Sequence, residues 1–232
     1  MEKFNNHLAA ELENLGIQNP LKITNDWLNL IDQNPVEASK LLNLKVRSFW
    51  NGLFEKRTVE ICHWVEPFLI GSVLDLICGD GNIGFELSKI KDLRVFYSDY
   101  RHRFIDSEAF LDYKVLQKSN LKIKVDTVIL VTVLHHNVDP DQLMKLAFKI
   151  ARKRVIIIEN PLTATYGKEF HINYDKFFKS LNPSNDSNPF NHHNNQFWFK
   201  MASMYGDVIY QDSKNSISGV PFDHQLIVIN KK

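Results

Sequence analysis

The fold of this chain is decided by residues 73–84, which read VLDLICGDGNIG. An apolar run that includes one acid, Asp75, leads into closely spaced glycines, and a helical pattern begins near Gly84. This order predicts a strand whose carboxyl end turns sharply into a helix. Because Gly79 and Gly81 have no Cβ, a ligand can lie against their backbone. In an open parallel sheet, a nucleotide-like cofactor binds in this crevice.

Two families of nucleotide-binding proteins fit this loop. Residues 79–84, GDGNIG, match the dinucleotide fingerprint GxGxxG. Residues 75–81, DLICGDG, resemble the first motif of class I S-adenosylmethionine-dependent methyltransferases, D-x-G-x-G-x-G. We favour the second family, because a diphosphate gains nothing from a nearby carboxylate, whereas Asp75 suits the cationic amino acid end of the methyl donor. The alternative for Asp75 is a plain loop cap.

The chain departs from the family's pattern at Ile77, where the family most often has its first glycine. The branched side chain either crowds the donor or points harmlessly into the sheet. If Ile77 is a strand residue, replacing it with glycine costs strand stability. This departure leaves a second interpretation open, in which the chain is a methyltransferase-like protein that binds a ligand or partner but catalyses no reaction.

Strand and helix patterns alternate from Val73 onward, which is typical of α/β proteins. The expected strands are Val73–Leu76, Leu93–Ser98, Lys114–Gln117, Asp126–Val133, Val155–Ile158, Val208–Gln211 and Leu226–Ile229. The expected helices are Gly84–Ile90, Arg103–Leu111, Pro140–Arg152 and Gln196–Tyr205, and residues 160–196 suggest loop and short helix. The pattern resembles the Rossmann-like class I methyltransferase sheet, with seven strands in the order 3-2-1-4-5-7-6 and the last one antiparallel.

Helical patterns fill the chain ahead of the first strand, ending in an amphipathic stretch from Val46 to Phe68. We therefore expect an N-terminal helical cap, residues 1–70, and an S-adenosylmethionine-binding methyltransferase domain, residues 71–232. The cap and the segment after the fifth strand are expected to close the acceptor pocket. The side chains proposed to line or cover that pocket are Tyr166, His171, Tyr174 and His192.

Asp99 closes the second expected strand, 20 residues after Gly79. An acid at this spacing accepts hydrogen bonds from both ribose hydroxyls in either family, so it supports a nucleoside-bearing cofactor without separating the two. The resemblance implies further donor contacts, which are Arg57 (to the donor carboxylate), Asp75, Gly79, Gly81, Tyr100 (along the adenine), Asn120 and Thr132.

The fourth expected strand ends in Leu134-His135-His136, which looks like the L-H-H variant of methyltransferases that act on small molecules and lipids. The carboxyl end of this strand faces the donor's methyl group in that family. An imidazole titrates near neutrality, so His135 or His136 is the candidate catalytic residue that takes a proton from the acceptor. The histidines lie at irregular spacings with no cysteine near, and we expect no metal site.

Composition limits the remaining choices. The 232 residues carry a net charge of +1 with both signs interspersed, unlike the basic stripe of a nucleic-acid-binding protein. No apolar run approaches the roughly 18 residues of a membrane helix, and the first residues lack a secretory signal pattern. Cys62 and Cys78 form no disulfide framework. We expect a cytoplasmic protein with a small-molecule acceptor and neither a nucleic-acid nor a membrane partner.

Together these patterns predict an S-adenosylmethionine-dependent enzyme that moves a methyl group to oxygen, nitrogen or carbon of a small metabolite, such as a natural-product intermediate. An NAD-dependent oxidoreductase on the same glycine loop is the first alternative. The Tyr-x-x-x-Lys spacing common in such enzymes occurs only at Tyr210 and Lys214, late in the chain. The helical N-terminus also counts against it. A non-catalytic binding protein is the second alternative.

Overall fold

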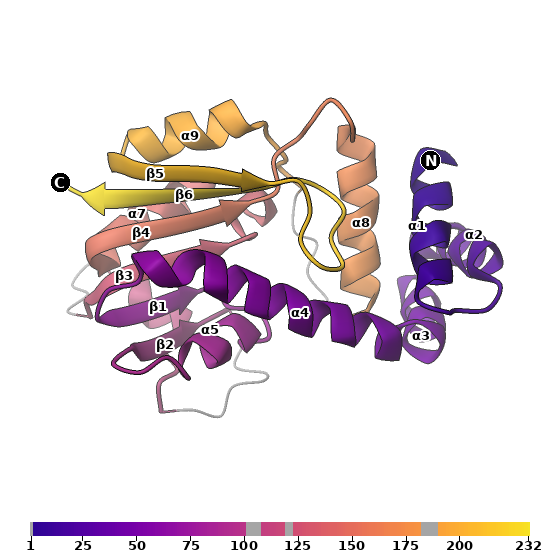
Figure 1. The fold of residues 1–232 in the computed structure, drawn as a ribbon, viewed down its shortest axis with the longest axis horizontal. Coiled ribbons are helices and arrows are strands. Elements are labelled where there is room, and N and C mark those ends of the chain that lie inside the picture. The colour runs from indigo at the N-terminus through magenta and orange to yellow at the C-terminus, as the bar shows by residue number, and fades with distance from the viewer. Residues whose placement is uncertain (1, 101–107, 119–122, 182–189) are drawn as a thin grey trace. The chain divides into compact units, whose positions relative to one another are not determined.

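The computed structural model describes residues 2–100, 108–118, 123–181 and 190–232. The chain divides into two compact units, which are Met1–Phe54 with Leu162–Ser187 and Glu55–Pro161 with Asn188–Lys232. The positions of these units relative to one another are not determined (Figure 1). We name them the helical unit and the sheet unit.

The described part of the sheet unit holds a six-stranded sheet in the order β2-β1-β3-β4-β6-β5. The strands are β1 (Ser72–Leu76), β2 (Arg94–Ser98), β3 (Val125–Val131), β4 (Ala151–Glu159), β5 (Gly206–Lys214) and β6 (His224–Lys231). Strands β1 to β4 are parallel, whereas β6 runs antiparallel to both of its neighbours. The carboxyl ends of β1 to β4 therefore share one edge of the sheet, where the candidate site lies.

Helices cover both faces of this sheet. They are α4 (Arg47–Val65, in this unit from Glu55 on), α5 (Asn82–Leu87), α6 (Tyr113–Leu116), α7 (Pro140–Ile150) and α9 (Asn195–Ser203), with the short 3-10 helices η1 (Glu66–Phe68) and η2 (Leu134–His136). Side chains alternate across a strand. Leu74 and Val128 thus pack with α7 and α9 on one face, whereas Val73 and Ile129 pack with α4 and α5 on the other.

The strand order confirms the predicted fold class, with one correction at the third strand. The segment expected as a strand, Lys114–Gln117, is instead the helix α6, because the Asp112 side chain caps it by accepting from Lys114 N–H at 2.7 Å. Beside β2, where the third strand was expected, Tyr97 and Phe110 form one isolated parallel β-bridge. The helix expected over 103–111 is also wrong where described, since residues 108–111 are not helical, and 101–107 lie outside the described residues.

The helical unit consists of α1 (Glu2–Asn14), α2 (Pro20–Ile31), α3 (Pro35–Lys45), the first part of α4, and α8 (Lys168–Leu181). Helix α8 is longer than the loop and short helix expected there. Its Phe177 ring lies 5.7 Å from Trp27 and 4.9 Å from Trp50, and Trp27 Nε1 donates to Ser180 Oγ at 3.1 Å. The N-terminal aromatics therefore pack with a helix far along the chain. The role of residues 1–70 as a cap stays a prediction.

None of the helices in the described ranges has both the length and the apolar character needed to cross a membrane.

Candidate functional site

The loop after β1 has the left-handed backbone that its glycines allow, with φ of 60° at Gly79 and 76° at Gly81. A Cβ built on Gly79 would meet no heavy atom within 4 Å. A Cβ on Gly84 would instead lie 2.5 Å from the ring of Tyr97. Gly79 is therefore open for a ligand, whereas Gly84 is needed for packing between α5 and β2.

Asp99 comes directly after β2, which pairs with β1. The backbone N–H of Gly79 donates to Asp99 Oδ2 at 3.0 Å. Two of the predicted donor-binding residues thus meet across the carboxyl ends of neighbouring strands. A ligand over Gly79 would lie beside this carboxylate.

Asp75 lies under the glycine loop and is 2 % exposed. Its Oδ2 accepts from the N–H of Gly84 at 3.1 Å, within the first turn of α5. Burial raises the pKa of this carboxyl from 3.8 to about 7, although the Gly84 hydrogen bond lowers it. The carboxylates of Asp80 and Asp99 raise the pKa further. The loop is therefore a region of negative potential.

Arg57 lies near this acidic region, where Asp80 acts on its charge. Arg57, on α4, donates from Nη2 to Thr132 Oγ1 at 3.3 Å, and its Nε is buried without a hydrogen-bond partner among the described residues. Burial lowers the pKa of Arg57 to about 10, whereas Asp80 raises it. Arg57 therefore remains protonated at neutral pH and is under-satisfied, as expected for a group that receives an anionic part of a ligand. The structure brings together Arg57 and Thr132, two predicted donor contacts.

Two β-branched residues near this edge have left-handed backbones, Ile77 with φ of 61° and Thr132 with φ of 50°. Ile77 follows β1 and Thr132 follows β3, and these strands are paired. A β-branched residue rarely adopts positive φ, and such strain gathers at functional sites. Ile77 is thus a turn residue, and the expectation that glycine there would cost strand stability is wrong.

Replacing Ile77 with glycine should give a more stable protein than replacing it with alanine, by about 1–2 kcal/mol, because alanine keeps the Cβ that strains a left-handed residue. Both variants lose the packing of Ile77 against the core, so their difference isolates the backbone. Urea unfolding measures the two free energies. If the alanine variant is the more stable, as is usual at negative φ, Ile77 is not left-handed in solution.

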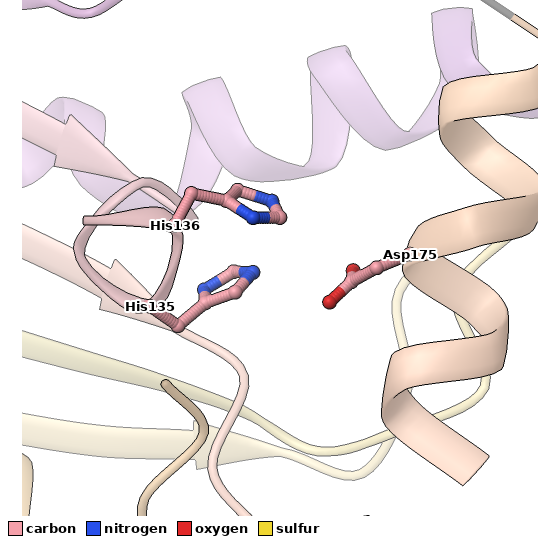
Figure 2. A group of neighbouring side chains, drawn as sticks. All are labelled: His135, His136 and Asp175. Atoms are coloured by element: carbon pink, nitrogen blue, oxygen red, sulfur yellow. The ribbon is translucent and has the colours of Figure 1, made fainter. Parts of the chain in front are cut away.

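His135 and His136 project together from η2, the turn after β3 (Figure 2). Their ring centroids are 4.0 Å apart. His135 is 2 % exposed, and its Nδ1 lies 2.6 Å from Glu159 Oε2. Asp175, drawn in the same figure, belongs to α8 of the helical unit. Both candidate catalytic histidines thus stand at the same sheet edge as the glycine loop.

Glu159 is the functional candidate that sequence reasoning missed. It ends β4, one residue beyond the pair Val131 and Ile158 in the parallel register with β3. That register puts it beside the turn that carries His135. An acid closing a β-branched strand, as Asp99 closes the second, was the available signal.

Tyr100 follows Asp99 and is 52 % exposed. Its hydroxyl donates to Asn137 Oδ1 at 3.0 Å, and its ring lies 4.3 Å from that of Tyr113. The side chain thus links the end of β2 to the turn after β3. Asn120, the predicted adenine contact, lies outside the described residues.

The segment before α9 returns to the histidine turn. Asn191 donates from its backbone to His135 O at 2.8 Å and from Nδ2 to Asn137 O at 2.6 Å. The ring of His192 stacks on His135 at 4.8 Å. This contact brings His192 to the candidate site. The other proposed pocket residues, which are Tyr166, His171 and Tyr174, belong to the helical unit.

No family model matches the chain, and a search of curated proteins finds no match. Solved structures, by contrast, do match the chain. Magnesium protoporphyrin IX methyltransferase from Synechocystis PCC 6803, solved with bound SAH, has a TM-score of 0.54 at 18 % identity, covering 78 % of this chain and 84 % of that chain. A possible histamine N-methyltransferase from Thermotoga maritima has a TM-score of 0.56 at 16 % identity, covering 79 % and 93 %. The N-methyltransferase NodS from Bradyrhizobium japonicum WM9 has a TM-score of 0.52 at 11 % identity, covering 78 % and 97 %. The chain therefore has the class I methyltransferase fold.

Proposed function

We propose that this chain is an S-adenosylmethionine-dependent methyltransferase that acts on oxygen, nitrogen or carbon of a small metabolite. The observation that carries the choice of ligand is the charge around the glycine loop. Burial is the main cause of the raised pKa of Asp75, and the negative charges of Asp80 and Asp99 beside it raise that pKa further.

A dinucleotide would place a diphosphate, with two negative charges, against this acidic loop. The methyl donor instead brings an ammonium and a sulfonium, which the carboxylates attract, and one carboxylate, which we assign to Arg57. The open backbone at Gly79 and the acid at Asp99 suit the nucleoside part that both ligands share. Charge thus favours the methyl donor over NAD.

Each site residue then has a role in the proposed reaction. The donor supplies a methyl group on a sulfonium, which is already a good electrophile, so the protein mainly positions the reactants. We assign the ribose hydroxyls to Asp99, the adenine to Tyr100 and the donor carboxylate to Arg57. His135 or His136 takes the proton that the acceptor loses.

The names of the solved neighbours support a small acceptor, because one is a magnesium protoporphyrin IX methyltransferase and another a possible histamine N-methyltransferase.

A thermal shift assay tests the choice of ligand directly. A ligand at 100 times its Kd adds about 2.7 kcal/mol to the free energy of unfolding, which raises the Tm of a chain of this size by roughly 5–10 °C. We expect this shift with S-adenosylmethionine and with its demethylated product, and none with NAD. A shift with NAD alone would make the chain an oxidoreductase candidate.

Donor binding does not by itself establish transfer. A screen of small hydroxyl, phenol and amine metabolites with labelled S-adenosylmethionine measures it, with mass spectrometry of the product. Donor binding without transfer to any acceptor would favour the non-catalytic binding protein.

Replacing Asp99 with alanine should weaken donor binding by about 1–3 kcal/mol, because a charged acceptor of hydrogen bonds from the ribose is lost. Calorimetry with S-adenosylmethionine measures the change. Asp207→Ala is the matched control, since the Asp207 side chain is 66 % exposed in β5, at the far edge of the sheet. Unchanged affinity in the Asp99 variant would remove this residue from the donor site.

A further inference from the structure

The side chain of Tyr100 joins the ends of two strands that are not adjacent in the described sheet. The strand order is β2-β1-β3, so β2 and β3 lie about 10 Å apart with β1 between them. Tyr100 comes two residues after β2, and its hydroxyl donates at 3.0 Å to Oδ1 of Asn137, which follows β3 and the turn η2. The tyrosine therefore reaches across the end of β1, where the chain enters the glycine loop.

A second hydrogen bond fixes the orientation of the Asn137 side chain. Its Nδ2 donates to the backbone carbonyl of Val133 at 2.6 Å, across the turn η2. A carbonyl oxygen can only accept hydrogen bonds, so the amide NH₂ must face Val133 and the amide oxygen must face Tyr100. The hydroxyl of Tyr100 is consequently the donor, and the amide cannot flip without losing its bond to Val133.

The ring of Tyr100 is held in place although it is half exposed to solvent. It packs against the buried ring of Tyr113, with the ring centroids 4.3 Å apart, while its hydroxyl is held by Asn137. A side chain with two such contacts has already lost much of its rotamer freedom on folding. A planar ligand that stacks on the exposed part of the ring therefore has less to immobilise, and this preorganisation raises its affinity.

Asn137 also closes the turn that carries the two candidate catalytic histidines. Val133 and Asn137 flank η2, and the bond between them spans it. Asn191 donates from Nδ2 to the backbone carbonyl of Asn137 at 2.6 Å and from its backbone N–H to His135 O at 2.8 Å. Asn137 thus joins the ring assigned to the adenine with the histidine turn and with the segment before α9.

We propose that Asn137 is a positioning residue for the methyl donor, whose side-chain amide holds the Tyr100 ring ready to stack on the adenine and ties that ring to the histidine turn. The inference rests on the proposed methyltransferase function, and it adds the residue that links the donor side of the site with the acceptor side. Asp99, directly before Tyr100, accepts from the backbone N–H of Gly79. The ribose and the adenine would therefore both meet side chains that are already in place.

The first test replaces Tyr100 with phenylalanine, which removes the hydroxyl and keeps the ring. Calorimetry with the demethylated product of S-adenosylmethionine measures the affinity. We expect a loss of about three- to tenfold, because the ring must now be immobilised when the adenine binds. Tyr205→Phe is the matched control, since the Tyr205 hydroxyl likewise donates to a side-chain oxygen, that of Asp141 in α7, and this variant should bind like wild type.

The second test asks whether the effect of the hydroxyl passes through the amide. Asn137→Ala should weaken binding by about the same factor as Tyr100→Phe, and the double variant should bind no more weakly than either single variant, because both changes break the same hydrogen bond. The contact of Asn191 with the Asn137 backbone remains in all three variants. With saturating donor and an acceptor from the screen, kcat should fall in Asn137→Ala, which loses the bond to Val133, and stay unchanged in Tyr100→Phe.

The outcomes separate this proposal from the function on which it rests. If S-adenosylmethionine and its product both fail to bind the wild-type protein, the proposed function fails. If they bind wild type and Tyr100→Phe equally well, the hydroxyl does not hold the ring and the proposal is overturned, whether or not Asn137→Ala folds. Losses that multiply in the double variant would show that the two side chains act independently, and an unchanged kcat in Asn137→Ala would remove the link to the acceptor side; either result would also overturn the proposal.

Discussion

Replacing Gly79 with valine is expected to abolish donor binding, with a loss in affinity of more than about 100-fold, or about 3 kcal/mol. Nothing in the described protein lies within 4 Å of a Cβ at this position, so the new side chain would occupy the space proposed for the donor. The same change adds a backbone penalty of about 1–2 kcal/mol, because Gly79 has φ of 60°. Calorimetry measures the affinity, and urea unfolding measures the penalty.

Gly16→Val separates these two effects. Gly16 follows α1, has φ of 77°, and also has no heavy atom within 4 Å of a Cβ. Its variant should show the same backbone penalty as Gly79→Val and keep normal donor affinity. If Gly79→Val binds S-adenosylmethionine normally, the glycine loop is only a structural turn.

Replacing Asp75 with asparagine is expected to stabilise the protein at pH 8 by about 4 kcal/mol. Above about pH 4 the carboxyl has lost its proton in the unfolded chain, whereas in the folded protein it keeps the proton up to about pH 7. The folded state therefore binds one more proton between these pH values. Its stability falls as pH rises through them, by about 1.4 kcal/mol per pH unit. Asparagine does not titrate and avoids this loss.

Urea unfolding between pH 3 and pH 8 measures this difference, which should vanish near the acidic limit, where Asp75 is protonated in both states. Asp126→Asn is a control of opposite sign. The pKa of Asp126 is lowered, chiefly by its hydrogen bond from the Ser72 backbone, so its variant should lose stability at pH 8. Equal stability of Asp75→Asn and wild type at pH 8 would show that Asp75 is solvated.

Donor affinity distinguishes the two roles left open for Asp75. Asparagine can still accept from Gly84 N–H and so keeps the loop's shape, but it removes the charge. If Asp75 attracts the cationic end of the donor, affinity falls by roughly tenfold at pH 8. A plain loop cap would leave it unchanged. Gain in stability with loss of binding is the pattern expected of a residue kept for function.

Local sequence patterns were sufficient for much of the fold. The run from Val73 to Gly84 predicted a strand, a glycine turn and a helix, and the structure has β1, the loop and α5 there. Asp99 at the end of the second strand was equally readable, because the carboxyl ends of parallel strands meet at one edge. The alternating apolar runs predicted where the strands lie along the chain, and the resemblance to class I methyltransferases implied their order in the sheet.

Short segments were misread where one local contact outweighed propensity. Lys114–Gln117 looked like a strand, yet the Asp112 cap makes it α6, and the edge beside β2 is reached by Phe110 instead. Ile77 carries a branched side chain that favours a strand, but the turn into the glycine loop requires a left-handed residue at that point.

The sequence by itself therefore determined the class of fold, the glycine loop and its acidic neighbours, because these depend on residues close together in the chain or on the shared direction of parallel strands. Only the tertiary structure decided that α8 packs with the N-terminal helices, where Phe177 meets Trp27 and Trp50. Only the register of β4 against β3 could show that Glu159 contacts His135, 24 residues earlier in the chain. Such pairings depend on how separate elements pack, and no periodicity within either element records them.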